Sequence, residues 1–145
     1  MSAQIQFSTP YSNDNIFAKI LRGEIPNHTV IDTDECLAFM DVMPQAPGHT
    51  LVIPKAPAVT LLDLTPAQLA SLMECTQRVA KAVKTALNAE GITLMQLNGS
   101  EAGQTVPHTH FHIIPGSLLK ARAHATTQAS PEELATMAKR ISAEL

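Results

Sequence analysis

The sequence predicts an α+β fold in which an antiparallel sheet of about five strands is covered by helices on one face. Two observations support this prediction. Five runs of β-forming residues are bounded by turn residues, and three further segments carry helical periodicity or helix caps: one short, one long and one near the C-terminus. With 145 residues, of which 45% are hydrophobic and 16% charged, the chain is long enough to bury the core of a single globular domain.

The N-terminal part contains a polar stretch followed by a short helix. Residues 1–13 lack periodicity, so we expect a flexible arm there. Asn13 or Asp14 can cap the next segment, and Gly23 is the usual stop at its end. Between them the apolar residues recur at helical spacing and predict a short amphipathic helix; they are Ile16, Phe17, Ile20 and Leu21.

The β-forming runs follow in order along the chain. Residues 28–32 and 36–41 lie on either side of a turn and predict a hairpin. Residues 49–54 form the next strand, after a link made rigid by two prolines and turned by a glycine. Residues 92–98 and 108–115 predict the last two strands. The chain has no internal repeat, so we expect the strands to form one sheet.

The longest helix has a well-defined start. Thr65 is an N-cap, Pro66 occupies the first helical position, and Gln68 lies three residues after the cap, where it completes a capping box. An apolar stripe then continues until Gly91, which predicts a helix of about 23 residues.

A second capping box, formed by Ser130 and Glu133, opens a last helix near the C-terminus. The chain therefore divides into an arm (1–13), a central domain (14–116), and a C-terminal tail and helix (117–145). No linker separates the last part from the domain, so we expect its helix to pack on the same core.

Composition excludes several classes of function. The net charge is −3 and the ten basic residues are spread along the chain, so no surface for nucleic acid is indicated. The sequence has no apolar run long enough for a membrane span and no signal peptide, which predicts a cytoplasmic protein without a membrane partner. Cys36 and Cys75 fall in apolar patterns, and we interpret both as buried thiols rather than a disulfide or a metal pair.

Three histidines occupy alternate positions of the last predicted strand. On a strand, His108, His110 and His112 would share one face, with neighbouring Cα atoms roughly 6.5 to 7 Å apart. Two chemistries use such a row. A metal site needs a further ligand from elsewhere, whereas nucleophilic catalysis needs one histidine whose attacking nitrogen is free while its neighbours orient it. Spacing alone favours nucleophilic catalysis and leaves metal binding open.

The segment 108–114 resembles the His-φ-His-φ-His-φ-φ pattern of the histidine-triad (HIT) family, where φ is apolar, with Thr109 as the imperfect position. Other segments are similar to the Hint-like branch of this family of nucleotide-binding hydrolases, in family order: 15–20, 22–26, 37–41, 44–49 and 98–115. The likeness therefore covers residues 14–115 and implies a HIT-like fold for the domain 14–116.

The resemblance implies a role for each matching residue. His110 corresponds to the histidine that attacks the α-phosphorus of a nucleotide, with His108 and His112 beside it and His49 as a fourth histidine near the site. Asp41 corresponds to the acid that accepts hydrogen bonds from the ribose hydroxyls. The apolar slot for the base corresponds to Ile16, Phe17, Ile20, Ile25 and Phe39, and the loop positions that hold the phosphate and the leaving group correspond to Asn98, Gln104 and Thr105.

The implied activity is hydrolysis of nucleoside 5′-phosphoramidates, similar to an adenosine 5′-monophosphoramidase, through a covalent nucleotidyl-histidine. Two alternatives remain open: a dinucleoside polyphosphate hydrolase, and a nucleotide-binding regulator with little turnover. The implied partners are a purine nucleotide or nucleoside phosphoramidate and a second copy of the chain, in a homodimer formed through the long helix and the strand 92–98.

The sequence departs from the family in three ways. Asn15, Ala18 and Pro57 stand where zinc-binding relatives carry ligands, so we expect no zinc there and no cofactor. Gly116 replaces an arginine that often follows the triad, and the chain has no tryptophan. Two further histidines, His28 and His124, match no motif, and we expect both at the surface.

Overall fold

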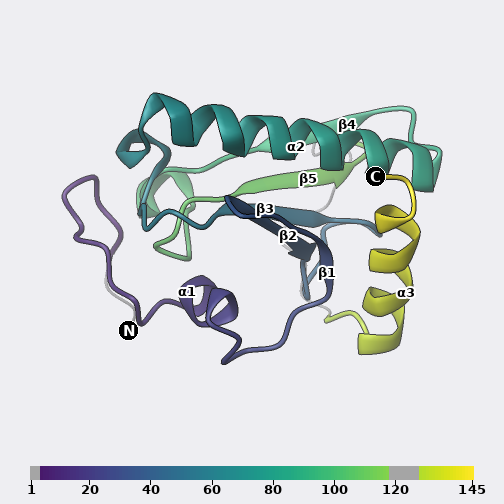
Figure 1. Cartoon of the computed structure of the whole chain (residues 1–145), viewed down its shortest axis with the longest axis horizontal. Coiled ribbons are helices and arrows are strands. Elements are labelled where there is room, and N and C mark those ends of the chain that lie inside the picture. Colours follow the sequence, from purple (N-terminus) through teal and green to yellow (C-terminus); the bar gives the residue numbers. More distant parts are fainter. Residues whose placement is uncertain (1–3, 118–127) are drawn as a thin grey trace.

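The computed structural model describes residues 4–117 and 128–145, and its centre is a five-stranded antiparallel sheet (Figure 1). The strand order is β1-β2-β3-β5-β4. The strands are β1 (Thr29–Asp32), β2 (Cys36–Met40), β3 (Thr50–Pro54), β4 (Ile92–Met95) and β5 (Phe111–Pro115). Each strand lies inside the β-forming run that predicted it, which confirms the α+β class.

Three α-helices accompany the sheet: α1 (Ile16–Leu21), α2 (Pro66–Leu87) and α3 (Pro131–Ser142). The capping boxes predicted for α2 and α3 are both present. The cap predicted for α1 is wrong by one or two residues, because the side chain of Asn15, rather than Asn13 or Asp14, accepts a hydrogen bond from the Ala18 backbone N–H at 2.9 Å. Two short 3₁₀ helices, η1 (Leu61–Asp63) and η2 (Ser100–Ala102), lie in the connections.

Helices cover both faces of the sheet, so the expectation that they share one face is wrong for α1 (Figure 1). The reason lies in β2, whose five residues are all buried. Alternate residues of β2 face opposite sides: Ala38 packs in the core beneath α2 and α3, while Phe39 packs with Phe17 and Ile20 of α1. A strand that is apolar on both faces needs cover on both, and α1 supplies the second layer.

The strand β5 begins at Phe111, three residues later than predicted. Val52 of β3 pairs with Phe111, and in the same register Thr109 would face Pro54. Proline has no N–H to donate, so the ladder stops there. The Thr109 N–H donates instead to the Ala58 carbonyl, at 2.9 Å. His108 and His110 therefore lie just before the strand, where interactions other than the ladder hold them.

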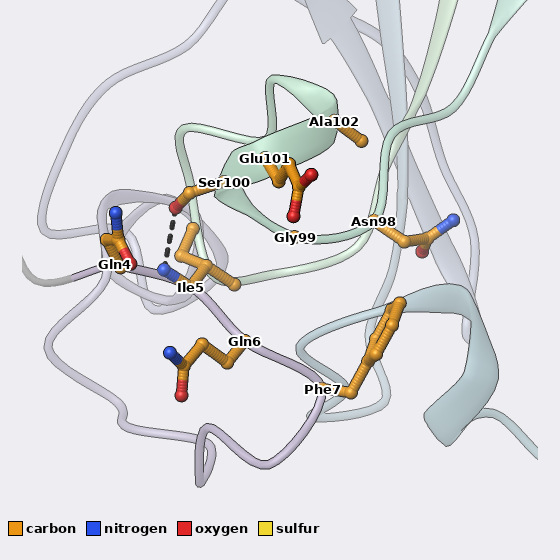
Figure 2. Close-up of a pocket in the computed structure, with 9 residues that line it drawn as sticks. All are labelled: Gln4, Ile5, Gln6, Phe7, Asn98, Gly99, Ser100, Glu101 and Ala102. Carbon is orange, nitrogen blue, oxygen red and sulfur yellow. Dashed lines mark hydrogen bonds between the residues drawn. The ribbon is translucent and has the colours of Figure 1, made fainter.

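The N-terminal arm has no helix or strand in its described part, residues 4–13, but it is attached to the domain. The Ile5 N–H donates to the Ser100 hydroxyl at 2.6 Å (Figure 2). The Ser100 N–H donates back to the Ile5 carbonyl at 2.8 Å. The Ile5 side chain is buried. The prediction of a flexible arm did not include this anchor, because the anchor depends on a residue 95 positions away.

The two cysteines and His28 lie where the sequence predicts them. Cys36 and Cys75 are buried free thiols, and His28 is partly exposed. His124 lies outside the described residues. Within 4–117 and 128–145, no helix is both long and apolar enough to cross a membrane.

We predict that Gly48→Ala destabilises the fold more than Gly116→Ala does. Both glycines have positive φ angles, +93° and +88°, so both substitutions incur backbone strain. A Cβ at Gly48 would lie 2.2 Å from the Leu87 side chain and 3.2 Å from that of Pro115, whereas nothing lies within 4 Å of one at Gly116. Urea denaturation should show an additional loss of about 1–2 kcal/mol for Gly48→Ala. Equal losses would mean that α2 moves freely away from this turn.

Candidate active site

Four predicted site residues meet at one end of three neighbouring strands. Asp41 follows β2 and His49 precedes β3, and the antiparallel pairing of these strands places the two side by side, with the Asp41 N–H donating to the His49 carbonyl at 3.0 Å. β3 also pairs with β5, where His112 is the second residue. The sheet thus brings His110 and His112 to residues that lie 61 to 71 positions earlier in the chain.

His108 is fully buried, and both of its ring nitrogens have partners. Nε2 lies 2.8 Å from the Pro54 carbonyl oxygen, which can only accept, so Nε2 carries the proton and donates. Nδ1 then accepts from the Tyr11 hydroxyl at 2.7 Å. Burial lowers the pKa of His108 to about 4, so the ring is neutral at pH 7. His108 therefore has no ring nitrogen free for a ligand.

His110 has one ring nitrogen in use and one free. Nδ1 lies 2.7 Å from the His108 backbone carbonyl, so Nδ1 carries the proton and donates. This leaves a lone pair on Nε2, which has no hydrogen-bond partner in residues 4–117 and 128–145. Phe17 contacts the ring edge-on, with centroids 4.9 Å apart. Burial lowers the pKa of His110, which keeps Nε2 unprotonated at neutral pH. This is the state that a nucleophile requires.

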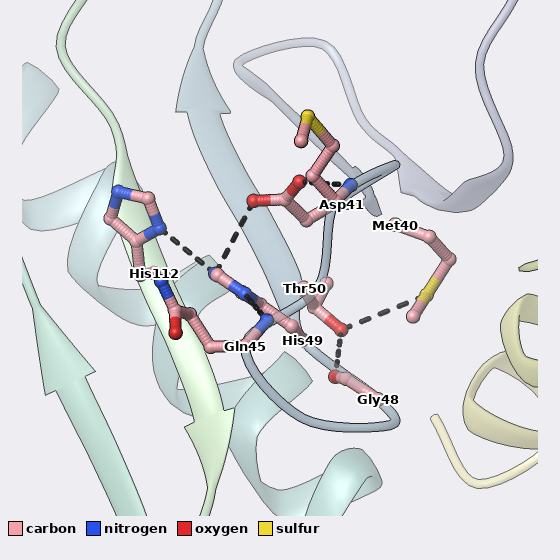
Figure 3. A network of polar contacts seen from close by, with 8 residues as sticks. Met40, Asp41, Gln45, Gly48, His49, Thr50 and His112 are labelled. Atoms are coloured by element: carbon pink, nitrogen blue, oxygen red, sulfur yellow. Dashed lines mark hydrogen bonds and ion pairs between the residues drawn. The ribbon is translucent and has the colours of Figure 1, made fainter. Parts of the chain in front are cut away.

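His49 and His112 form a chain of hydrogen bonds that starts at a backbone amide (Figure 3). The Gln45 N–H donates to Nδ1 of His49 at 3.0 Å, so the proton of the neutral His49 ring is on Nε2. Nε2 donates to Nδ1 of His112 at 2.9 Å and lies 3.5 Å from the Asp41 carboxylate. The proton of His112 is therefore on its Nε2.

The pKa values of His49 and His112 are both lowered, which keeps the two rings neutral. Burial, together with the neighbouring His110 and His49, lowers the pKa of His112 to about 3. Burial also lowers the pKa of His49, although Asp41 opposes this shift. The His110 and His112 rings lie 5.0 Å apart, centroid to centroid. A phosphate group against this pair would meet a lone pair from one ring and an N–H from the other, the arrangement that attack at phosphorus needs.

The same region also contains a set of potential metal ligands. One atom each of Asp41, His49 and His112 lie within 4.8 Å of one another, so these residues could hold a divalent metal ion. Spacing alone left metal binding by the histidine row open, but it could not identify this set, because His49 and Asp41 lie 63 and 71 positions before His112.

The predicted base slot is assembled for four of its five residues. Phe17, Ile20 and Phe39 are buried in one cluster and Ile25 packs at its margin. Ile16 is outside this cluster and is 48% exposed. The slot therefore has a packed floor, and Ile16 is the member open to solvent.

The three loop residues differ in how they are held. Asn98 accepts from the Leu61 N–H at 2.8 Å, and the buried Gln104 accepts from the Gly99 N–H and donates to the Val59 carbonyl, each at 2.7 Å. Both amides thus shape the loop. Thr105 is exposed.

Two residues that orient the histidines had no role in the sequence analysis. Gln45 acts through its backbone, so its side-chain type carries no signal. Tyr11, the single tyrosine of the chain, lies in a segment without periodicity.

The sequence profile of the HIT domain matches residues 22–118, which include every histidine of this site. The chain belongs to the HIT family. Its structure is similar to a crystal structure described as a Hit-like protein involved in cell-cycle regulation from Bartonella henselae, with an unknown ligand. The two share 47% sequence identity and a TM-score of 0.88, over 94% of this chain and 100% of the other.

Two relatives of this HIT protein carry names that state an activity. An adenosine 5′-monophosphoramidase of Saccharomyces cerevisiae is 41% identical over 100 residues, which are 69% of this chain and 61% of the yeast protein. An adenylylsulfatase of Arabidopsis thaliana is 37% identical over 108 residues, which are 74% of this chain and 55% of the plant protein. Both belong to the Hint branch, which confirms the resemblance found in the sequence.

We predict that the free energy of unfolding falls as the pH is lowered from 6.5 toward 4, and that His108 contributes to this slope. In the unfolded chain the ring takes up a proton near pH 6.5, whereas in the fold it does so only at about pH 4. Between these values the unfolded state binds more protons. Each unit by which the pH falls therefore lowers the free energy of unfolding by about 1.4 kcal/mol for this ring.

Urea denaturation at several pH values would test this prediction. His108→Gln should reduce the slope by about that amount per unit. Thr76→Val, which removes a buried hydroxyl without a titratable group, should lower stability and keep the slope. An unchanged slope in His108→Gln would contradict the buried, neutral ring.

Proposed function

We propose that this HIT protein hydrolyses nucleoside 5′-phosphoramidates through a covalent nucleotidyl-His110 intermediate. The observation that carries the proposal is the neutral His110 ring, whose Nδ1–H is bonded to the His108 carbonyl while Nε2 keeps a free lone pair. Two named relatives support the substrate class. One is an adenosine 5′-monophosphoramidase and the other an adenylylsulfatase, so both names contain the same nucleotide part with different leaving groups.

The reaction would proceed in two displacements at the α-phosphorus. In the first, Nε2 of His110 bonds to phosphorus and the P–N bond breaks, while the leaving nitrogen takes the proton from Nε2 of His112. In the second, water attacks phosphorus, the bond to His110 breaks, and the proton of the water returns to His112. The products are an amine and a nucleoside monophosphate. Loss of its single proton leaves a negative charge on the His112 ring, and the positive charge formed on the His110 ring balances it until the second step.

The remaining residues would bind the nucleotide. Phe17, Ile20, Phe39 and the margin at Ile25 would form the floor under a purine, and the exposed Ile16 would close over its edge. Asp41, which is partly exposed at 20%, would accept hydrogen bonds from the ribose hydroxyls with the carboxylate that also lies beside His49. A cytoplasmic location and the absence of nucleic-acid or membrane partners belong to this proposal and rest on composition.

We predict that His110→Ala abolishes turnover but keeps most of the affinity for a nucleoside monophosphate. The substitution removes the attacking nitrogen and leaves the base floor and Asp41 unchanged, so affinity should change by about tenfold or less, which corresponds to about 1.4 kcal/mol. Acid quench of the wild type with a phosphoramidate labelled on the nucleotide phosphate should trap the label on histidine, and His110→Ala should trap none.

His108→Ala is the matched variant for this experiment. It alters a ring without a free nitrogen, so it should lower the rate and still form the labelled intermediate. Near-normal turnover by His110→Ala would refute the mechanism, and label on His49 would assign the nucleophile to that residue. Cleavage of a dinucleoside polyphosphate in preference to the phosphoramidate would favour the first alternative activity, and binding without turnover would favour a regulator.

We also propose a homodimer, formed through β4 and α2. β4 lies at one edge of the sheet and its Leu94 side chain is 47% exposed, while Met73 on α2 is 38% exposed. An apolar edge strand of this kind can pair with its copy across a two-fold axis.

We predict a mass in solution of twice 15.6 kDa, measured by light scattering at micromolar concentration. Leu94→Lys should shift the protein toward the monomer because it places a charge at the centre of the edge. Leu62→Lys, at a 70% exposed position in η1, should not. A monomeric wild type would contradict the dimer.

A further inference from the structure

The described part of the N-terminal arm reaches the histidine row at Tyr11, which lies outside the segment that matches the HIT domain. Its hydroxyl lies 2.7 Å from Nδ1 of His108, and the two rings meet edge to face with centroids 5.5 Å apart. Ring packing and hydrogen bond together hold the tyrosine in one orientation. The arm thus contributes a polar group to the first histidine of the row.

The direction of this hydrogen bond follows from the opposite side of the imidazole. Nε2 of His108 faces the Pro54 carbonyl, which has no proton to give, so the single proton of the neutral ring is on Nε2. Nδ1 therefore has only a lone pair and needs a donor. His108 is 0% exposed, and Tyr11 is the one donor to Nδ1 in the described chain. The Tyr11 O–H consequently donates.

The orientation of His108 has a consequence for its neighbour. The backbone carbonyl of His108 accepts from Nδ1–H of His110 at 2.7 Å, and this bond keeps the lone pair of His110 on Nε2. Without the Tyr11 hydroxyl, the buried Nδ1 of His108 would lack a partner, which is costly enough to favour another tautomer or ring position. Either change would break the Pro54 hydrogen bond and move the peptide unit that holds His110.

The arm is built so that Tyr11 stays in place. Ile5 and Ser100 exchange two hydrogen bonds at the far end of the arm. Between that anchor and Tyr11 the chain makes a turn in which the Gln6 N–H donates to the Thr9 hydroxyl at 2.8 Å and the Thr9 N–H donates to the Gln6 carbonyl at 3.0 Å. Ser100 also belongs to the loop that precedes the histidine row, so the arm links both parts.

We propose that Tyr11 is a positioning residue: by donating to His108 it sets the tautomer of that ring and, through the His108 carbonyl, the orientation of the nucleophile His110. The catalytic part of this inference rests on the proposed function, whereas the tautomer part does not. The two parts can therefore be tested separately on the full chain.

The first test is nitrogen NMR of the histidine rings in the wild type and in Tyr11→Phe. In the wild type, His108 should show a protonated Nε2 and an Nδ1 that accepts a hydrogen bond. Tyr11→Phe, which keeps the ring and removes only the hydroxyl, should shift the Nδ1 resonance of His108 toward that of a nitrogen without a donor, or change the tautomer. Phe7→Ala is the matched control, because Phe7 lies on the same arm and is 65% exposed.

The second test is kinetic and uses the same variants with a nucleoside phosphoramidate. Tyr11→Phe should lower kcat by about tenfold, equivalent to about 1.4 kcal/mol, with KM within about threefold of the wild type, because the base floor and Asp41 are not altered. Phe7→Ala should keep both constants. Loss of folding in Tyr11→Phe would appear in the circular dichroism spectrum, and the wild-type tautomer of His108 would still test the inference.

The outcomes separate the inference from the proposed function. An Nδ1-protonated His108 in the wild type, or an unchanged His108 spectrum in Tyr11→Phe, would overturn the inference whatever the enzyme does. A spectral change without a change in kcat would overturn the positioning of His110. A wild type that shows the expected His108 tautomer but does not turn over the phosphoramidate would overturn the proposed function and leave the tautomer assignment standing.

Discussion

The site depends on one constraint: an imidazole nitrogen that is closed off from solvent needs a hydrogen-bond partner, and a neutral ring has only one proton to offer. For His108 both partners are supplied by the protein, from the Pro54 carbonyl and the Tyr11 hydroxyl. For His110 only one is supplied, by the His108 carbonyl. The free lone pair on Nε2 of His110 is therefore a property of the hydrogen-bond network rather than of the residue type, and burial maintains it by disfavouring protonation.

Each of these partners is fixed by the backbone of the sheet or its connections. The Pro54 carbonyl is available because a proline at the end of β3 halts the ladder with β5 and leaves His108 and His110 outside it. The Gln45 N–H is available because the connection between β2 and β3 turns back toward His49. The Pro54 carbonyl and the Gln45 N–H both lie where regular secondary structure is interrupted. These interruptions hold the imidazole rings in place, and the flanking strands determine where the interruptions lie.

Features that depend on neighbouring residues could be predicted from the sequence, whereas features that depend on distant residues could not. Local signals were sufficient for the capping boxes of α2 and α3 and for the position of each strand, because a cap or a turn involves residues a few positions apart. The triad itself was recognised from its spacing. The start of β5 at Phe111 was not, since it depends on a proline in another strand, and neither was the placement of α1, which depends on the second apolar face of β2. Tyr11 lies 97 positions from its partner, and no local pattern reports such a contact.

Asp41, His49 and His112 could either ligate a metal ion or share protons in a chain of hydrogen bonds. In a tetrahedral zinc site with bonds of about 2.05 Å, two ligand nitrogens lie roughly 3.3 Å apart. The His49 and His112 nitrogens are closer, at 2.9 Å, which is the usual separation for a proton shared between them. A metal would also have to displace the proton from Nε2 of His49, which the Gln45 N–H holds there by occupying Nδ1. The backbone amide at Gln45 therefore favours the hydrogen-bonded chain, and through it the N–H that His112 presents beside the nucleophile.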